Sequence, residues 1–440
     1  MFSTNKTPSI VIYLVLLAFA LRFYQNFGSY LQPGINGGYY PVQVRSILKT
    51  GRLAYMDTPL IFYFQALLSF LLNKFTAYNL SSIILFVTKF TDTLIPPLVL
   101  FPIYAFLRKR CSVVGSSLIA SMSVFSIFIL QGLSGDFTKN SAALALLGFY
   151  YVELYRKKRN IFKLILLFIL TSLTHKTGLL LATITTAILI SSKLKFIKDL
   201  KYKRMVIIIL VISVLFQTIL SFLSPSVLCM LLSNLKIVST ENYIGLIFTW
   251  AITLILLVAV TEINEKIPHE ILVSIIMLIF LTLNLSSLLL GKSYAERFWF
   301  LSTSTLVFAL ILGIKYIREK WRFAIYSAIA IYTTFSILYF FQSHKLPIIK
   351  ETAYKEIMLN LPTDPNSIVV AEHGIDWWIA FATKNKVAQD GILVDKYSKI
   401  YYVNYYPRKE VYAWFGTVTV PESAELHYDG EYIKIYVDQK

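Results

Sequence analysis

Charged residues are scarce in this sequence, and their scarcity excludes a soluble globular protein. Only 15% of the 440 residues are Asp, Glu, Lys or Arg, whereas 56% are hydrophobic. The mean hydropathy is accordingly high, at +0.64. Hydrophobic runs long enough to cross the ~30 Å hydrocarbon core of a membrane recur as far as Phe341. The composition therefore indicates a multi-pass membrane protein.

Cysteine is rarer still, with Cys111 and Cys229 as the only two. Both lie in or beside predicted spans, so we expect neither a disulfide framework nor a metal site built from cysteines. The sequence also has no metal-ligand spacing, no glycine-rich phosphate loop and no nucleophile elbow. The hydrophobic run 10–23 carries no small-residue cleavage site, which predicts a retained membrane anchor rather than a signal peptide.

Acidic residues are outnumbered by basic ones, 24 against 42, which gives a formal net charge of +18. In a soluble protein this excess would suggest a nucleic-acid partner. Here the basic residues gather in short loops between hydrophobic runs, which indicates cytoplasmic loops and no nucleic acid. The clusters lie at Lys6 and at residues 108–110, 156–159, 193–204 and 315–322. We predict a prokaryotic-type plasma-membrane protein with a cytoplasmic N-terminus.

The positions of these clusters also predict the topology. If every cluster is cytoplasmic, an even number of crossings must separate neighbouring clusters. Three hydrophobic segments, 8–23, 59–73 and 80–107, lie between the first two clusters, so one of them does not span. Segment 59–73 has about 15 residues, fewer than the roughly 20 that a span requires. It begins with a proline and is rich in aromatic residues, which predicts a helix lying in the outer interface.

The same counting along the whole chain predicts about 11 transmembrane helices. Residues 24–79 then form one extracytoplasmic loop with two interfacial helices. The expected fold is an all-α polytopic membrane domain over residues 1–342, followed by a small extracytoplasmic α+β domain over residues 343–440. No internal repeat is visible in the sequence.

The last hundred residues have a composition unlike the rest. Residues 367–373 and 399–406 are typical of strands, and residues 425–437 predict a hairpin around Asp429-Gly430. Residues 351–361 have helical spacing and stop at Pro362. A domain this short has little core of its own, so we expect it to dock on the membrane part.

The first outer loop supplies the first candidate functional residues. The dipeptides Pro33-Gly34 and Gly37-Gly38 allow backbone turns. Residues 40–49 then have hydrophobic positions at helical spacing, with Arg45 beside them. The guanidinium of Arg45 either binds a lipid phosphate through its planar fork or anchors the helix at the membrane surface.

Two carboxylates lie on the predicted outer side. Asp57 precedes Thr58-Pro59 at the start of the second interfacial helix, and Asp136 lies in the next outer turn. Each could cap the helix that follows it or act as a general base. If folding brings the two together, they form a polar catalytic centre.

Polar residues at predicted membrane depth are the next candidates. His175 and Lys176 interrupt two short hydrophobic segments, and they face either a cavity or the headgroup layer. Lys89 and Asp92, three residues apart within a predicted span, favour an internal ion pair. These alternatives remain open at the level of sequence.

Two further pairs lie at the ends of predicted elements. Arg297 opens a span and either faces an anionic substrate or pairs with Glu296. Trp377 and Trp378 follow Glu372 at a predicted strand-to-helix junction, where tandem tryptophans are most simply a docking surface at the bilayer.

The layout of residues 34–140 resembles the GT-C glycosyltransferases, in particular the branch with protein mannosyltransferases and lipid A aminoarabinose transferase. It combines a first span, a glycine-rich outer turn, Tyr39-Tyr40, an amphipathic helix and a proline-led aromatic helix. The resemblance implies a membrane enzyme that transfers a sugar, with inversion, from a polyprenyl-phosphate carrier to a glycan, lipid or protein acceptor on the outer face. Such donors need no nucleotide site.

These families place an acidic residue in the first outer loop, before the aromatic helix begins. The matching turn here is residues 36–40, so Asn36 stands where the family usually has Asp. An amide cannot take a proton from an acceptor. The resemblance therefore leaves Asp57 or Asp136 as the base, or else implies a catalytically inactive scaffold or accessory subunit of a glycan-assembly complex.

The resemblance also implies cations that hold the carrier phosphate, and a divalent metal is optional. A transporter for a lipid-linked glycan is a further alternative, and it would require paired broken helices and repeat symmetry. By charge, side and motif, the candidate substrate-binding residues are Asn36, Tyr39, Tyr40, Arg45, Lys139, His175, Lys176 and Arg297.

Overall fold

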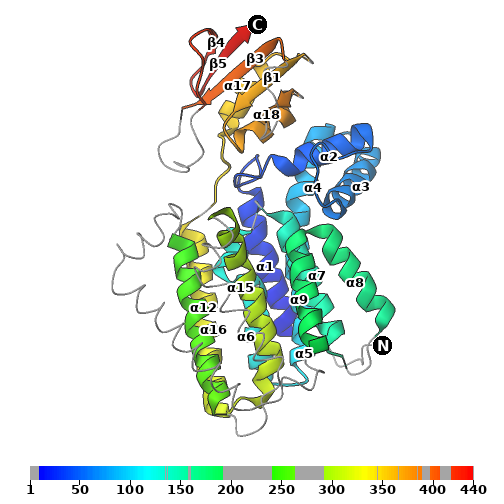
Figure 1. Cartoon of the computed structure of the whole chain (residues 1–440), viewed down its shortest axis with the longest axis vertical. Coiled ribbons are helices and arrows are strands. Elements are labelled where there is room, and N and C mark those ends of the chain that lie inside the picture. Colours follow the sequence, from blue (N-terminus) through cyan, green and yellow to red (C-terminus); the bar gives the residue numbers. More distant parts are fainter. Residues whose placement is uncertain are drawn as a thin grey trace. The chain divides into compact units, whose positions relative to one another are not determined.

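The computed structural model contains helices along most of the chain and a small sheet near its C-terminal end (Figure 1). The chain divides into two compact units. The helical unit comprises Met1–Arg22, Leu94–Ser134 and Thr138–His344, and the mixed unit comprises Phe23–Thr93, Gly135–Phe137 and Lys345–Lys440. The structure describes residues 9–133, 135, 137–156, 160–191, 240–262, 292–343, 345–364, 366–383, 385–388, 397–406 and 418–439.

The helical unit is built from hydrophobic helices. α1 (Ser9–Phe27) begins in this unit and ends in the mixed unit. The predicted domain boundary at residues 342–343 stays a prediction. The other helices of this unit are η1 (Pro96–Val99), α5 (Leu100–Leu107), α6 (Val113–Phe125), η2 (Phe128–Gly132), α7 (Thr138–Leu154), α8 (Ile161–Thr174), α9 (Lys176–Ser191), α12 (Thr240–Thr261), α15 (Lys292–Gly313), η4 (Ile314–Tyr316) and α16 (Glu319–Gln342).

Three helical stretches in the described residues are long and apolar enough to cross a membrane: Ser9–Phe27, Leu80–Leu107 and Glu319–Gln342. They identify a membrane protein, but the expected count of about 11 spans is not borne out. Many expected spans are shorter than the roughly 20 residues that a crossing requires, such as Val113–Phe125 and Ile161–Thr174. The spans expected near residues 205–224 and 271–290 lie outside the described residues. The orientation stays a prediction.

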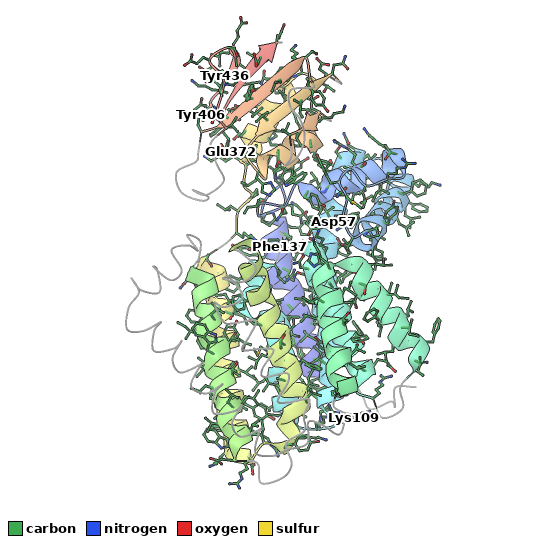
Figure 2. All side chains as sticks on the ribbon, in the orientation of Figure 1. Asp57, Lys109, Phe137, Glu372, Tyr406 and Tyr436 are labelled. Carbon is green, nitrogen blue, oxygen red and sulfur yellow. The ribbon has the colours of Figure 1, made fainter. Side chains whose placement is uncertain are left out.

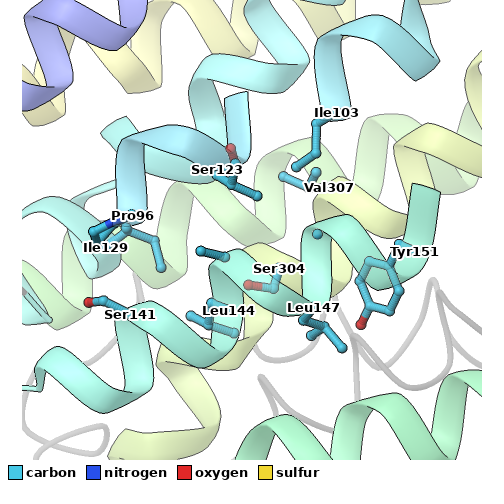
Figure 3. Close-up of a pocket in the computed structure, with 13 residues that line it drawn as sticks. Pro96, Ile103, Ser123, Ile129, Ser141, Leu144, Leu147, Tyr151, Ser304 and Val307 are labelled. Atoms are coloured by element: carbon cyan, nitrogen blue, oxygen red, sulfur yellow. The ribbon is translucent and has the colours of Figure 1, made fainter. Parts of the chain in front are cut away.

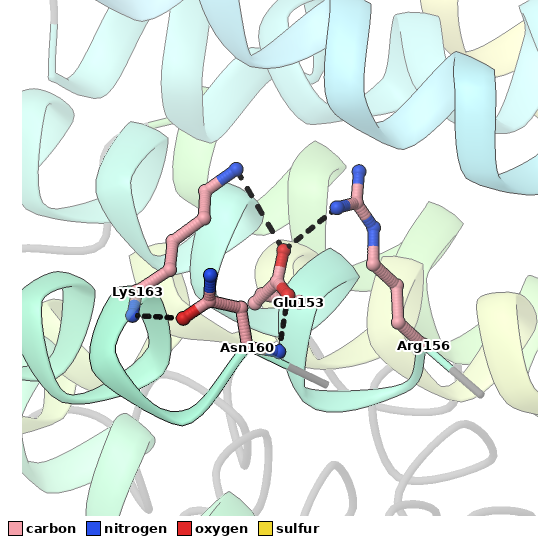
Figure 4. A network of polar contacts seen from close by, with 4 residues as sticks. All are labelled: Glu153, Arg156, Asn160 and Lys163. Carbon is pink, nitrogen blue, oxygen red and sulfur yellow. Dashed lines mark hydrogen bonds and ion pairs between the residues drawn. The ribbon is translucent and has the colours of Figure 1, made fainter. Parts of the chain in front are cut away.

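The turn between α7 and α8 shows how a basic cluster is tied to the helices (Figure 4). The buried carboxylate of Glu153 lies 3.0 Å from the guanidinium of Arg156 and 3.7 Å from the ammonium of Lys163. It also accepts a hydrogen bond from the Asn160 N–H, and the Asn160 side chain caps α8. Pairing with two cations and an N–H compensates the carboxylate for its lost hydration.

The mixed unit joins the first loop to the C-terminal segment. The first loop forms α2 (Tyr39–Thr50) and α3 (Leu60–Phe75), and α4 (Leu80–Leu94) begins directly after it. The predicted C-terminal strands, hairpin and first helix are confirmed, and the strand-to-helix junction leads into α18. The C-terminal elements are α17 (Glu351–Asn360), β1 (Ser367–Ala371), α18 (Ile375–Thr383), β2 (Lys386–Val387), β3 (Lys399–Tyr405), β4 (Glu425–Asp429) and β5 (Ile433–Gln439).

The five strands form one sheet in the order β2-β1-β3-β5-β4. β1 is parallel to β2 and β3, and β5 is antiparallel to β3 and β4. Parallel neighbours need a crossover, and α18 supplies it between β1 and β2. Its inner face joins a hydrophobic core shared by the sheet, α17 and α2, which includes Val44, Ile357, Trp378, Tyr401 and Ile433.

The tandem tryptophans belong to this protein core. Trp377 is 5% exposed and Trp378 is fully buried, so the predicted docking surface at the bilayer is wrong. Trp378 packs against Tyr354 of α17 and Phe381 of α18. The reason is that α18 turns its aromatic face toward α2, α17 and the sheet, where large aromatic rings gain most from burial.

α3 forms where residues 59–73 predicted a helix, and its two faces differ. Ile61, Phe62 and Ala66 are buried, whereas Tyr63 and Leu67 are 44% and 55% exposed. A helix of 16 residues with an exposed hydrophobic stripe fits the expected interfacial helix better than a span. Its location in the membrane interface stays a prediction.

Gly38, which precedes α2, sets how closely the first loop approaches α18. A Cβ atom at Gly38 would lie 2.9 Å from the Trp377 Cβ and 2.9 Å from the Trp378 nitrogen. Gly38→Ala should therefore destabilise the protein by about 1–3 kcal/mol through overpacking, measured as a lower thermal unfolding midpoint in detergent. The matched control is Gly51→Asn, because no atom lies within 4 Å of that position and Asn tolerates its positive φ. Equal midpoints for the two variants would contradict the close packing.

Candidate functional site

One loop of the mixed unit, between α2 and α3, carries Asp57. α2 ends at Gly51, which adopts φ 72° and donates its N–H to the Ile47 carbonyl at 2.8 Å. The loop then folds back onto the fully buried side chain of Gln43. Gln43 Oε1 accepts from the N–H groups of Ala54 and Tyr55 at 2.8 and 3.1 Å, and Gln43 Nε2 donates to the Tyr55 carbonyl at 2.9 Å. These bonds fix the loop to α2.

The carboxylate of Asp57 is half-buried and held at both oxygens (Figure 2 labels this residue). Oδ2 accepts a hydrogen bond from the Tyr39 hydroxyl at 2.6 Å. Oδ1 accepts from the Thr58 N–H at 2.7 Å and from the Thr58 hydroxyl at 3.3 Å. The residue before α3 is Pro59, and the helix has no side-chain cap. The contacts of Asp57 with Tyr39 and Thr58 thus lie ahead of α3, which begins at Leu60.

An aromatic wall packs around Tyr39, whose hydroxyl binds this carboxylate. The Tyr39 ring lies 4.9 Å from Trp377 and 5.6 Å from Phe62, and the Tyr55 ring lies 4.8 Å from Trp377, measured between ring centroids. Trp377 comes from α18, so the C-terminal segment helps to orient the hydroxyl that binds Asp57. Such edge-to-face contacts hold rings in fixed positions.

Burial keeps both tyrosine hydroxyls of this wall protonated. It raises the pKa of Tyr39 well above its usual value, and the hydrogen bond to Asp57 adds to the shift. Burial, with the negative charge of Asp376 as the next cause, raises the pKa of Tyr55 to about 12. A neutral phenol is a hydrogen-bond donor, so Tyr39 can donate to the Asp57 carboxylate at any physiological pH.

The other predicted residues of the glycine-rich turn have structural contacts as well. The Asn36 carbonyl accepts from the Tyr39 N–H at 3.0 Å, which closes the turn before α2. Tyr40 is 1% exposed and packs against Tyr39 and Phe62. Within this turn Tyr39 contacts Asp57, while Tyr40 lies in the core.

Arg45 ties α2 to the last turn of α18. Its guanidinium donates to the carbonyls of Ala380 and Phe381, and it lies 5.2 Å from the centre of the Phe381 ring. The last carbonyls of a helix have no partner within the helix, so a buried cation there satisfies them. This contact gives Arg45 a structural role, and its binding of a donor phosphate stays a prediction.

A second polar centre of the mixed unit surrounds Asp92, which is fully buried. Asp92 Oδ2 accepts from the Asn26 side-chain amide and from the Gly135 N–H, both at 2.8 Å. Gln32 donates to the Gly135 carbonyl at 2.8 Å. Gly135 is the sequence neighbour of Asp136, which lies outside the described residues. Whether Asp57 and Asp136 share one site therefore stays a prediction.

The predicted ion pair between Lys89 and Asp92 does not form. The Lys89 ammonium donates to the carbonyls of Ser29 and Tyr30 at 2.6 and 2.7 Å, and lies 5.5 Å from the Phe27 ring centre. The turn that follows α1 offers these carbonyls close by, so the buried ammonium is satisfied without Asp92. The ion-pair prediction was wrong because helical spacing alone cannot show which way each side chain turns.

The remaining predicted cations belong to the helical unit. Lys139 lies in the first turn of α7, and Lys176 is exposed at the start of α9. His175 is buried at the break between α8 and α9, where its N–H bonds to the Thr171 carbonyl at 3.2 Å. The predicted interruption at this pair is thus real. Arg297 falls within α15, and its side chain lies outside the described residues.

The helical unit contains a small cavity of about 30 Å³, lined mainly by hydrophobic side chains such as Ile103, Leu147 and Val307 (Figure 3). Ser141, on its wall, accepts a hydrogen bond from the buried Arg22 at 3.3 Å. This volume suits about one water molecule, far less than a sugar needs. None of the predicted site residues lines this cavity.

The sequence interpretation missed Gln43, the residue that organises the Asp57 loop. A detectable signal was its spacing, because Gln43 follows Tyr39 by four residues and so lies on the same helix face. Asn26 and Gln32 were missed as well; both are buried amides, and they donate to Asp92 and to the Gly135 carbonyl, respectively. Among the described residues, no group of three His, Cys, Asp or Glu side chains could hold a metal.

No family model and no curated protein matches the chain. Solved structures of an oligosaccharyltransferase from Archaeoglobus fulgidus do match. The one tethered with an acceptor peptide containing the NVT sequon has a TM-score of 0.57 and 13% sequence identity, over 90% of this chain and 65% of that chain. The complex with Zn and sulfate has a TM-score of 0.52 and 13% identity, over 86% of this chain and 62% of that one.

At 13% identity these matches show the fold and nothing finer. The chain also spans less than two thirds of the length of the oligosaccharyltransferase it matches. That protein is a GT-C superfamily glycosyltransferase. The matches therefore give this chain a GT-C-like fold, with a mostly helical body and a small C-terminal sheet.

Proposed function

We propose that the chain is an inverting membrane glycosyltransferase that takes its sugar from a polyprenyl-phosphate carrier. Transfer occurs on the outer face of the membrane, to a glycan, lipid or protein acceptor. The observation that carries this proposal is the Asp57 carboxylate, which is half-buried and oriented by hydrogen bonds from Tyr39 and Thr58. The fold supports the same class of reaction, because the structures it resembles are oligosaccharyltransferases.

The chemistry needs a base beside the acceptor and positive charge beside the leaving phosphate. Asp57 accepts the proton of the acceptor as the acceptor atom attacks the anomeric carbon. The bond from that carbon to the carrier phosphate breaks in the same displacement, and the phosphate leaves with the bonding electrons. A single displacement inverts the anomeric centre. Asp136 is the second proposed catalytic carboxylate.

The phosphate partners are proposed from charge and predicted side. Lys139, His175, Lys176 and Arg297 come from the helical unit, and Arg45 comes from the mixed unit. The carrier is a membrane lipid, so its phosphate lies at the outer headgroup level while its tail lies along the helices. Of the turn residues, Asn36 is proposed to face the sugar, because Tyr40 is buried and the Tyr39 hydroxyl is bound to Asp57.

A polypeptide is the first acceptor to test. One of the matching oligosaccharyltransferase structures is tethered with an acceptor peptide. The extracytoplasmic placement of the mixed unit, proposed from charge, would make its Asp57 loop accessible to secreted or surface polypeptides. Glycan and lipid acceptors are the alternatives that the same assay distinguishes.

A divalent cation is not built into the proposed reaction. A matching structure is described as a complex with Zn and sulfate. In the described part of this chain, however, no three potential ligands cluster, and both oxygens of Asp57 are engaged by Tyr39 and Thr58. A divalent cation stays an optional part of the proposal, because Asp136 lies outside the described residues.

The second candidate function is a catalytically inactive GT-C scaffold within a glycan-assembly complex. The observation that favours it is Asn36, which stands where the resemblance implies an acidic residue. A scaffold would keep the packing of the mixed unit and lose the need for Asp57. Transport of a lipid-linked glycan is the weakest alternative, because no repeat is visible in the sequence.

Replacing the proposed base tests the function directly. Membranes carrying the wild type, Asp57→Asn or Asp136→Asn are supplied with a polyprenyl-phosphate sugar, and transfer to peptide, glycan and lipid acceptors is measured. Asp57→Asn should reduce transfer on the order of 100-fold or more, because the amide cannot take the proton. The matched control is Glu425→Gln, an exposed carboxylate of β4, which should retain full activity.

Equal activity in all four proteins would remove both carboxylates from the mechanism. No transfer even by the wild type, with every acceptor class, would favour the scaffold. Loss in Asp136→Asn alone would move the base to the second turn.

Arg45→Lys separates the two roles of that side chain. Because the Lys ammonium lacks the planar guanidinium that packs on Phe381 and reaches the two carbonyls from two separate nitrogens, the variant should unfold more easily by about 1–3 kcal/mol. Its KM for the lipid-linked donor should stay that of the wild type. Thermal unfolding in detergent and donor titrations measure the two effects, with the exposed Arg52→Lys as control. A higher KM at unchanged stability would instead assign Arg45 to the donor phosphate.

A further inference from the structure

Gln43 determines the direction of the hydrogen bond between Tyr39 and Asp57. Its Oε1 faces the N–H groups of Ala54 and Tyr55, which can only donate, so this atom must be the amide oxygen. Nε2 is then the amide nitrogen, and its two hydrogens point to the Tyr55 carbonyl and the Tyr39 hydroxyl, at 2.9 and 2.8 Å. The buried amide thereby uses its full hydrogen-bonding capacity.

This assignment fixes the proton of Tyr39. Since the Tyr39 oxygen accepts from Gln43, its own hydrogen is available for Asp57 Oδ2, 2.6 Å away. A carboxylate only accepts, so no other direction satisfies all three groups. The raised pKa of Tyr39, caused first by burial, means that the hydroxyl keeps this hydrogen.

We propose that Gln43 and Tyr39 form a one-way hydrogen-bond relay that positions the Asp57 carboxylate as the base of the transfer reaction. Tyr39 is thus a positioning residue that acts through Asp57, and Gln43 acts through Tyr39. The inference rests on the proposed function. It adds Tyr39 and Gln43 as residues whose loss should slow the reaction, Tyr39 by acting on Asp57 and Gln43 by acting on Tyr39.

The relay does two things for the base. Because its last bond is short and given to a charged group, it stabilises the ionised form of Asp57. Because Gln43 also holds the 54–55 backbone, the relay links the position of the loop to the position of the carboxylate oxygen. A rigid base keeps the geometry that proton transfer requires.

Other titratable groups lie near the relay, and their contributions to the pH profile must be distinguished from those of the relay. Tyr55 lies beside Tyr39, and Asp376 lies near Tyr55. Arg45 also acts on Tyr55 through its charge. His373, 47% exposed and 3.8 Å from Asp376, packs its ring 5.9 Å from Trp377. An imidazole titrates near neutral pH, so pH profiles are recorded with and without it.

The test uses two nearly isosteric variants of the full-length protein. Tyr39→Phe removes the hydrogen that reaches Asp57 and keeps the aromatic wall. Gln43→Glu keeps an oxygen for the two N–H groups but removes the donor to Tyr39, which can then turn its hydrogen toward the new carboxylate. The matched control is Tyr63→Phe, because the Tyr63 hydroxyl bonds to the Gly51 carbonyl at the start of the same loop.

Tyr39→Phe should lower kcat at neutral pH on the order of tenfold, with KM for the donor unchanged. Without the donor, ionised Asp57 is less stabilised, so the acid limb of the kcat profile should move to higher pH. The same shift should appear in a His373→Asn background. Gln43→Glu should act in the same direction and add nothing to Tyr39→Phe in the double variant, because both changes break one relay.

The outcomes separate this inference from the function it rests on. If Asp57→Asn retains activity, the proposed base is wrong and the relay has no reaction to serve. If Asp57→Asn is inactive while Tyr39→Phe has the wild-type rate and pH profile, the base stands and the relay is overturned. Additive effects of the two relay variants overturn it too, as does a rate loss matched by Tyr63→Phe. Thermal unfolding of each variant identifies a loss of folded protein.

Discussion

The packing of α18 against α2 is the contact on which the mixed unit depends. It brings Trp377 beside Tyr39, lets Arg45 satisfy the last carbonyls of α18, and places Trp378 in the common core. Gly38 allows this close packing, since even a methyl group at that position would collide with the tryptophan backbone. The Asp57 loop follows from this contact, because its aromatic wall comes from both partners. A carboxylate that is proposed to act as a base from a loop needs such support from rigid elements.

Buried amide side chains also hold the parts of this unit together. Gln43 in α2 and Asn26 at the end of α1 each connect a loop to a carboxylate, Asp57 in one case and Asp92 in the other. An amide offers both donors and acceptors, so it can satisfy backbone and side-chain groups at once without adding charge to an apolar core. Lys89 is a buried charged group instead, and its ammonium is satisfied by hydrogen bonds to backbone carbonyls.

Much of the fold could be predicted from the sequence, because strands, hairpins and amphipathic helices leave local patterns. The segments 351–361, 367–373 and 425–437 all form the expected elements. The number of spans could not be predicted, because hydropathy does not show where a helix breaks. The surroundings of Trp377 and Trp378 were predicted wrongly, because an apolar helix face has the same sequence pattern whether it contacts lipid or protein. Gln43 was overlooked because a polar residue on an amphipathic helix gives no sign of burial until its partners are known.

The mixed unit is assembled from three separate pieces of chain, and this has a consequence for its folding. Residues 23–93 leave the ribosome long before residues 345–440 exist. The intervening stretch, on the order of 250 residues, takes tens of seconds to synthesise at ~5–20 residues per second. During that time Tyr39, Val44 and Phe62 have no Trp377 or Trp378 to pack against. The first loop must therefore wait, with part of its future core uncovered, until the last residues of the chain arrive to complete it.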